Sequence, residues 1–114
     1  MKNRIIKCAC LAIIPALFMT VATAAEPDAD AANKLAKSSG CLKCHAVDKT
    51  KVGPSYKNVA KKYKGQADAK VKLITFITTG PSVKMAEGME MTHAIVNTKD
   101  KGEQENLVGW ILSQ

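Results

Sequence analysis

Residues 41–45 read Cys-Leu-Lys-Cys-His, and this short run decides how the rest of the chain can be interpreted. In an exported protein a C-x-x-C-H run is typical of covalent attachment of a c-type haem. The thiols of Cys41 and Cys44 can each add to a haem vinyl group, and His45 can place an imidazole nitrogen on the iron. The interpretation therefore depends on whether the chain is exported.

The N-terminus has the three parts of a secretory signal peptide. Residues 1–25 begin with three basic side chains, continue through an apolar run and end in Ala-Thr-Ala at 22–24, an A-x-A cleavage pattern. The apolar run contains Pro15 and is shorter than the roughly 20 residues that a membrane-spanning helix needs. We expect cleavage after residue 24 or 25 and a mature periplasmic domain over residues 26–114, with a retained membrane anchor as the alternative.

The mature segment is small, basic and poor in aromatic residues. The full chain of 114 residues carries 17 Lys and Arg against 10 Asp and Glu, and loss of the three basic residues in the signal peptide leaves a formal charge of +4. Of the four cysteines only Cys41 and Cys44 remain, which excludes a disulfide scaffold. A domain of about 90 residues with so few large side chains usually needs an additional stabilising element, and a haem would provide one.

Other uses of the same residues fit less well. A thioredoxin-type redox pair needs a βαβ context, and no strand-like run surrounds residues 41–45. A zinc site needs four ligands, and the segment offers only the two cysteines, His45 and the distant His93. Nucleic-acid binding is not expected, because the chain has no arginine after Arg4 and does not interleave aromatic with basic residues.

The periodicity predicts helices joined by loops, and hence an all-α domain. We expect four helix starts: after Asp28, at Tyr56 with Ser55 as N-cap, after Asp68 and after Asp100. Glycines mark two of the helix ends, Gly40 for the first helix and Gly80-Pro81 for the third.

The inward faces of these helices follow from i, i+3, i+4 spacing. We expect Val71 and Ile74 to face inward in the third helix, with Phe76 and Ile77 as further candidates. In the last helix we expect Leu107, Trp110 and Ile111 to do so. Residues 80–97 show no regular period.

The stretch AANKLAKSSGCLKCHAVDKTKVGPSYKNVAKKY, residues 31–63, resembles the small bacterial class I monohaem cytochromes c. The likeness continues through a methionine-containing loop to a last helix ending in LVGWILS. It implies about four helices wrapped around one covalently attached haem c, with the first and last helices crossing so that Ala32 and Ala36 meet Leu107 or Trp110. It also implies that the carbonyl of Pro54 accepts the imidazole N–H of His45, a contact that orients an iron ligand.

The resemblance implies a methionine as the second axial ligand, and three candidates lie in the loop: Met85, Met89 and Met91. Counting back from the last helix favours Met91, because residues 92–96 then match the family's run into that helix. Met89 is the alternative. The chain departs from the family here, since neither methionine is followed by proline and the usual loop tryptophan is absent from residues 80–91. His93 could replace methionine as a nitrogen ligand, but a hydrogen-bonding role at the surface or in the loop is the more common use of such a histidine.

These features together predict a soluble, monomeric one-electron carrier and not an enzyme, with no membrane contact except through a membrane-bound redox partner. Lysines that flank the segments near the haem predict redox partners with an acidic docking surface. They are Lys43, Lys49, Lys51, Lys57 and Lys84. The alternatives are a haem-based sensor or ligand-binding protein, and a cytochrome subunit of a larger periplasmic oxidoreductase.

Overall fold

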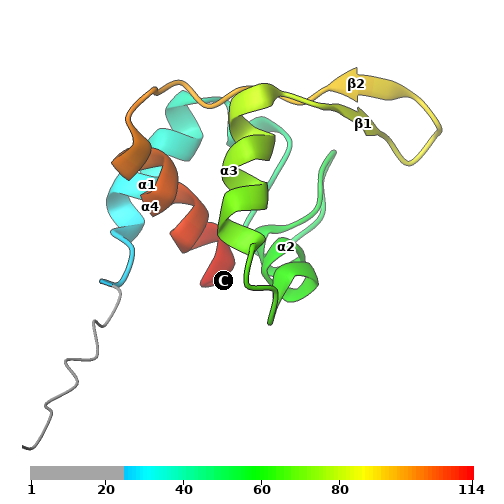
Figure 1. Ribbon diagram of the computed structural model, residues 1–114. Coiled ribbons are helices and arrows are strands. Elements are labelled where there is room, and N and C mark those ends of the chain that lie inside the picture. The colour runs from blue at the N-terminus through cyan, green and yellow to red at the C-terminus, as the bar shows by residue number, and fades with distance from the viewer. Residues whose placement is uncertain (1–24) are drawn as a thin grey trace, which may run out of the picture.

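The structure, a computed structural model, describes residues 25–114. The expected signal peptide therefore lies, except for its last residue, outside the described residues. Within these residues, four α-helices, one short 3-10 helix and a two-stranded hairpin follow one another (Figure 1). In order they are α1 Ala29–Ser38, η1 Cys41–Lys43, α2 Tyr56–Tyr63, α3 Ala69–Thr79, β1 Ser82–Lys84, β2 Glu90–Thr92 and α4 Lys101–Leu112.

The helices begin at the residues whose side chains were expected to cap them. Asp28 accepts a hydrogen bond from the backbone N–H of Ala31 at the start of α1, and Ser55 and Asp100 do the same for α2 and α4. Such caps satisfy backbone donors that the first helical turn leaves unpaired. Asp68 holds the N-cap position of α3 without a side-chain capping bond and pairs with Lys72 at 2.9 Å instead.

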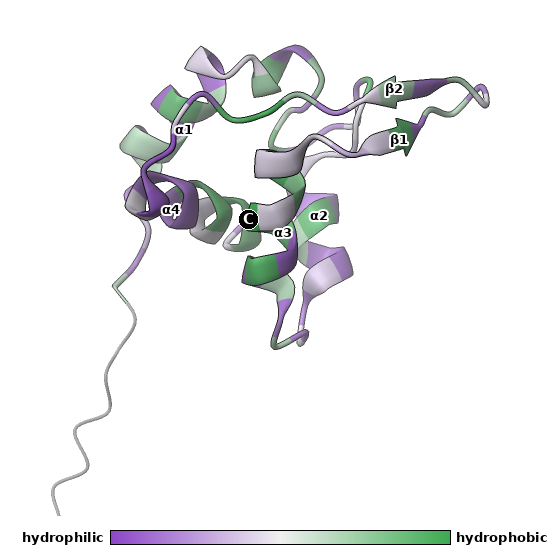
Figure 2. Cartoon of the chain, turned by 45° about the horizontal axis from the view of Figure 1, so that its top comes forward, coloured by the Kyte–Doolittle hydropathy of each residue, from purple (hydrophilic) through white to green (hydrophobic). Residues whose placement is uncertain are grey.

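The last helix, α4, is central, because α1, α2 and α3 all pack against it. Figure 2 shows its hydrophilic start and its hydrophobic second half. Ala32 and Ala36 of α1 are buried in one cluster with Leu107 and Trp110 of α4, which confirms the expected crossing. The small alanines allow the two helices to approach closely. The start of α1 is hydrogen-bonded to the Asn106 side chain of α4. Asn106 accepts from the N–H of Asp28 at 2.8 Å and donates to the carbonyl of Asp28 at 2.9 Å.

The inward face of α3 differs in part from the expected one. Val71 is 68% exposed, whereas Leu73 is buried and Phe76 and Ile77 are half-buried. The apolar residues of α3 allow two phases of the i, i+3, i+4 pattern, and the structure uses 73, 76 and 77. The prediction that Val71 faces inward was therefore wrong.

The loop after α3 contains a short antiparallel hairpin that the sequence reading did not predict. Strands β1 and β2 pair with Val83 opposite Met91, and Gly88, at φ 79°, lies in the connecting turn. Each strand has only three residues, too few for an alternating pattern to be recognised. The hairpin projects to one side of the helices (Figure 1), and the chain remains mostly helical. Within residues 25–114, no helix has the length and apolar content needed to cross a membrane.

Candidate functional site

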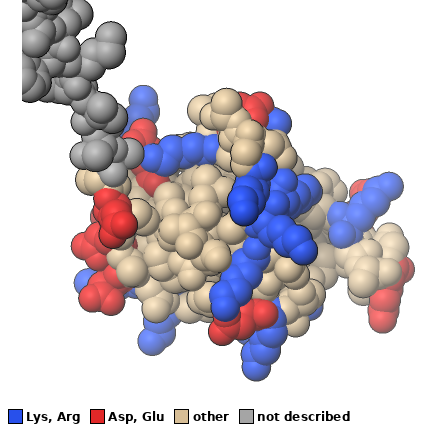
Figure 3. Space-filling view, turned by 90° about the horizontal axis from the view of Figure 1, so that it is seen from below, with Lys and Arg blue, Asp and Glu red and all other residues tan. Residues whose placement is uncertain are grey.

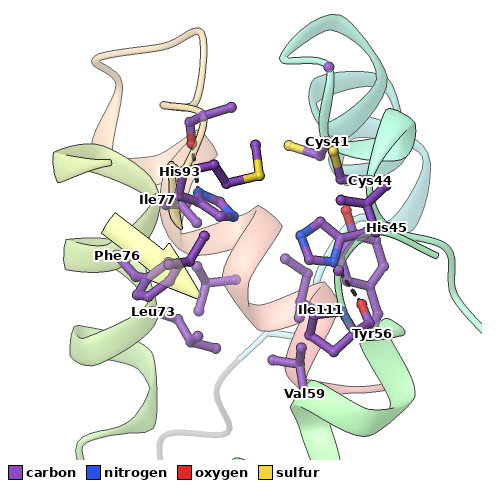
Figure 4. A pocket seen from close by; sticks show the side chains of 18 of the residues that line it. Cys41, Cys44, His45, Tyr56, Val59, Leu73, Phe76, Ile77, His93 and Ile111 are labelled. Carbon is purple, nitrogen blue, oxygen red and sulfur yellow. Dashed lines mark hydrogen bonds between the residues drawn. The ribbon is translucent and has the colours of Figure 1, made fainter. Parts of the chain in front are cut away.

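A cavity of about 310 Å³ opens between the C-x-x-C-H segment on one wall and α3 with the hairpin on the other (Figure 4). Its size is within the range of ligand pockets in proteins. Apolar side chains from three helices make most of its floor, namely Val59, Leu73, Phe76, Ile77, Leu107 and Ile111. The cavity thus lies against α4, the helix on which α1, α2 and α3 pack.

The local fold of residues 40–45 brings both thiols and the imidazole to the same cavity. Gly40, at φ 75°, ends the first helical segment, and η1 turns the chain so that the His45 N–H donates to the Cys41 carbonyl at 2.9 Å. Cys41 and Cys44 are both free thiols that line the cavity. Burial raises the pKa of the Cys41 thiol, and the nearby Cys44 raises it further.

The His45 ring is held by backbone atoms on two sides. Its Nδ1–H donates to the carbonyl of Pro54 at 2.7 Å, the contact that the resemblance implies. On the neighbouring residue, a Cβ placed on Gly53 would come within 2.5 Å of the ring carbon Cε1, so only glycine leaves room for the imidazole. Because Nδ1 carries the proton, Nε2 is left with a lone pair for a metal ion.

Tyr56 supports His45 from α2 and contributes a buried hydroxyl. The rings of His45 and Tyr56 stack at 5.6 Å between centroids, and the rings of Tyr56 and Trp110 form a T-shaped pair at 5.4 Å between centroids. The Tyr56 hydroxyl is buried without a hydrogen-bond partner among the described residues. Burial, with a smaller effect from Cys41, strongly raises its pKa, so the phenol stays protonated.

The three methionines of the loop lie in different surroundings. Met91 in β2 and Met85 after β1 both line the cavity, and Met91 is 40% exposed. Met89, in the turn of the hairpin, is 62% exposed and does not line the cavity. The cavity therefore brings Met91 and Met85, but not Met89, to the same space as His45.

His93 also lines the cavity, a position that the sequence analysis gave only as the less common alternative. Its ring is half-buried and meets the Phe76 ring edge-on at 4.8 Å between centroids. Burial lowers the pKa of His93, and the neighbouring His45 lowers it further, although the hydrogen bond to Ala94 acts in the opposite direction. Phe76 was already a candidate for the inward face of α3, but its contact with His93 joins residues 17 apart, which the sequence alone does not reveal.

The residues present fit a covalently attached haem. Two free thiols, a tethered imidazole and an apolar floor share one cavity, and an unpaired buried hydroxyl lines it too. Residues 25–114 hold no group of three or more His, Cys, Asp or Glu side chains able to bind a metal ion, and their strands form only the hairpin.

Comparison with known proteins agrees with this chemistry. The family model described as Cytochrome c matches residues 29–114. Cytochrome c2 of Rhodocyclus tenuis is 43% identical over 69% of this chain and 87% of its own length. Cytochrome c-552 of Nitrosomonas europaea is 36% identical over 94% of this chain and 97% of its own. The solved class 1 cytochrome MtoD of Sideroxydans lithotrophicus ES-1 superimposes with a TM-score of 0.73, at 51% identity over 76% of this chain and 96% of that one. The chain therefore belongs to the cytochrome c family, as one of its small class I electron-transfer members with a single covalently attached haem c.

Proposed function

We propose that this protein is a soluble, monomeric one-electron carrier of the periplasm, in which His45 and Met91 are the axial ligands of the haem iron. Residues 1–25 act as a removed signal peptide in this proposal, and residues 26–114 form the cytochrome domain. The observation that carries it is the cavity in which Cys41, Cys44 and His45 meet the methionine-bearing hairpin. Bound there, the haem would supply an Fe(III)/Fe(II) couple.

The surroundings of His45 suit electron transfer better than chemistry on a substrate. The Pro54 carbonyl and the close approach of Gly53 fix the ring, and the stacked Tyr56 adds a flat apolar support. A ligand held in this way changes little in position when the iron gains or loses an electron. A hydrogen bond from Nδ1–H to a carbonyl also makes the ligating nitrogen more basic.

The location of the methionines supports Met91 over Met89. Met91 lines the cavity from β2, where its pairing with Val83 fixes the register of the strand. Met89 is too exposed and lies outside the cavity lining. A thioether ligand favours Fe(II) and raises the reduction potential relative to two nitrogen ligands.

The Met91→Ala variant tests this ligand assignment. We expect the haem-loaded variant to lose the sulfur-to-iron charge-transfer band of the Fe(III) spectrum and to have a lower reduction potential. Met89→Ala is the matched control and should keep both. If Met89→Ala removes the band and Met91→Ala keeps it, the ligand is two residues earlier than proposed. If neither variant removes the band, Met85→Ala tests the remaining methionine.

The positive charge on the α2 side of the molecule supports the proposal that the redox partner has an acidic docking surface. Figure 3 shows lysine side chains gathered on the face seen from below, the side on which α2 lies in Figure 1. We call the exposed lysines of this helix and the residue after it the α2 lysine surface: Lys57, Lys61, Lys62 and Lys64. Lys62 also lines the cavity. Lys57 is partly neutralised, because its Nζ lies 2.5 Å from a carboxylate oxygen of Asp48.

A further inference from the structure

The cavity places a second imidazole opposite the first. The ring centroids of His45 and His93 are 5.9 Å apart, and their planes are inclined by 48°. Two imidazoles that bind one metal ion from opposite sides, each with its nitrogen about 2 Å from the metal as at zinc sites, have centroids roughly 6 Å apart. Figure 4 shows the His45 and His93 rings facing each other from opposite walls of the pocket.

The hydrogen bonds leave the same nitrogen free on both rings. The Nδ1–H of His93 donates to the Ala94 carbonyl at 2.8 Å, as the Nδ1–H of His45 donates to the Pro54 carbonyl. A carbonyl oxygen only accepts, so each Nδ1 carries a proton and the lone pair of the neutral ring is on Nε2. A backbone carbonyl is one of the usual hydrogen-bond partners for the nitrogen of a metal-bound histidine that does not touch the metal.

The backbone around His93 is fastened to the end of α3. The His93 N–H donates to the Pro81 carbonyl at 2.9 Å, and three residues on, the Val96 N–H donates to the Ile77 carbonyl at 2.9 Å. Gly80 allows this close approach, since a Cβ there would lie 2.8 Å from the His93 carbonyl oxygen. The ring also rests against Phe76. His93 is therefore held in the cavity wall by both its backbone and its ring.

Met91 and His93 differ in how firmly each is held. Met91 belongs to the projecting hairpin and is 40% exposed. His93 lies just beyond β2, at the base of the hairpin, where its N–H donates to the Pro81 carbonyl. Its ring packs against Phe76 of α3 and donates to the Ala94 carbonyl. Displacement of the hairpin would withdraw the thioether while leaving the imidazole near the cavity.

We propose that His93 is a second distal ligand, whose Nε2 takes the sixth position on the iron whenever Met91 leaves it. This inference rests on the proposed His45/Met91 ligation and adds a His45/His93 form of the same centre. The exchange replaces one iron–sulfur bond by one iron–nitrogen bond and needs no added oxidant or reductant. Two nitrogen ligands lower the reduction potential relative to one nitrogen and one thioether. Movement of the hairpin would thus change the potential and would keep external ligands off the iron.

The test compares the haem-loaded full chain carrying Met91→Ala with the double variant Met91→Ala/His93→Ala, using spin state and carbon monoxide affinity as readouts. We expect Met91→Ala to lose the sulfur-to-iron band but to remain six-coordinate and low-spin. The double variant should become high-spin. If His93 occupies the iron in nine of ten molecules, the apparent affinity of Met91→Ala for carbon monoxide is about tenfold weaker than that of the double variant.

Two controls keep the result interpretable. Added imidazole should return the double variant to a low-spin spectrum like that of Met91→Ala, which shows that its cavity is intact. Met89→Ala should leave spin state and carbon monoxide binding unchanged. A high-spin Met91→Ala with the same carbon monoxide affinity as the double variant overturns the proposal.

Failure of the Met91 assignment is distinguishable from failure of the His93 proposal. If Met91→Ala retains the sulfur-to-iron band, Met91 is not the ligand. The effect of His93→Ala is then measured in the methionine variant that does remove the band. If the unaltered protein has no such band, His93→Ala alone decides. A change to high spin then supports His93 as ligand, and an unchanged low-spin spectrum excludes it.

Discussion

At the scale of single residues, the position of His45, the proposed iron ligand, depends on a neighbour that has no side chain. Gly53 lies against the flat face of the imidazole, and the next residue, Pro54, supplies the carbonyl that accepts its proton. The sequence predicted the carbonyl contact through family resemblance. It could not predict the contact between Gly53 and the ring, because that depends on a distance between two segments of the folded chain.

Replacing Gly53 by alanine tests how tightly the His45 ring is held. The added Cβ would lie 2.5 Å from Cε1 of the ring, so the ring or the Gly53-Pro54 turn has to shift. We expect a changed Fe(III) spectrum and a loss of about 1–3 kcal/mol in the free energy of unfolding, as for other overpacked sites. Denaturant unfolding of the haem-loaded protein measures the loss. Gly109→Ala is the control, because its Cβ would be 3.6 Å from Pro27, and equal effects of the two changes would refute the argument.

At the scale of secondary-structure elements, the capping residues were the most reliable signal. A cap acts between residues only three apart, so its chemistry is visible in the sequence, and α1, α2 and α4 begin where Asp28, Ser55 and Asp100 predict. The inward face of α3 was not predictable in this way, because Val71 and Leu73 are equally apolar and only the packing partner α4 selects between them. The hairpin was missed because its pairing joins two segments that are individually too short to show a pattern.

The junction between α3 and the segment that carries His93 depends on Gly80. Its φ of 60° is costly for other residues, by roughly 1–2 kcal/mol, and a Cβ would also collide with the His93 carbonyl. We expect Gly80→Ala to lower the unfolding free energy by more than Gly65→Ala does. Gly65 is the matched control, since it has φ 78° with open space around its Cβ. Equal losses in chemical denaturation would mean that the close approach to His93 contributes nothing.

At the scale of the whole molecule, the charge is distributed unevenly around a cavity that the helices enclose. The α2 lysine surface borders the cavity through Lys62, whereas Lys101 lies at the start of α4 and does not line it. Exposed charges attract an oppositely charged partner over about a Debye length, roughly 10 Å at 0.1 M salt. Such attraction acts mainly on the association rate.

Neutralising Lys62 should therefore slow electron transfer to an anionic oxidant. We expect Lys62→Gln to lower the second-order rate of oxidation of the Fe(II) protein by hexacyanoferrate(III), measured by stopped flow, and to weaken the dependence of that rate on ionic strength. Lys101→Gln removes the same charge from another site and should have a smaller effect. Equal slowing by the two variants would mean that only the net charge matters.

The sequence predicted that the thiols of Cys41 and Cys44 and the imidazole of His45 lie together, since residues 41–45 are contiguous and their local turn brings these side chains to one cavity. The opposite side is assembled from α3, the hairpin and the segment after it, which the sequence reading could not place relative to one another. His93 shows this limit most clearly. Its position follows from the contacts of Phe76 and Pro81, which are separated from it by 17 and 12 residues and by the whole hairpin.

A reduction–oxidation titration of the haem-loaded protein, followed by its visible spectrum, tests the electron-carrier account most directly. We predict a single reversible one-electron transition, with a slope of about 59 mV per tenfold change in the ratio of oxidised to reduced protein, and a sulfur-to-iron band in the oxidised form. An irreversible titration, or an oxidised protein with an open, high-spin iron that binds external ligands, would contradict the account.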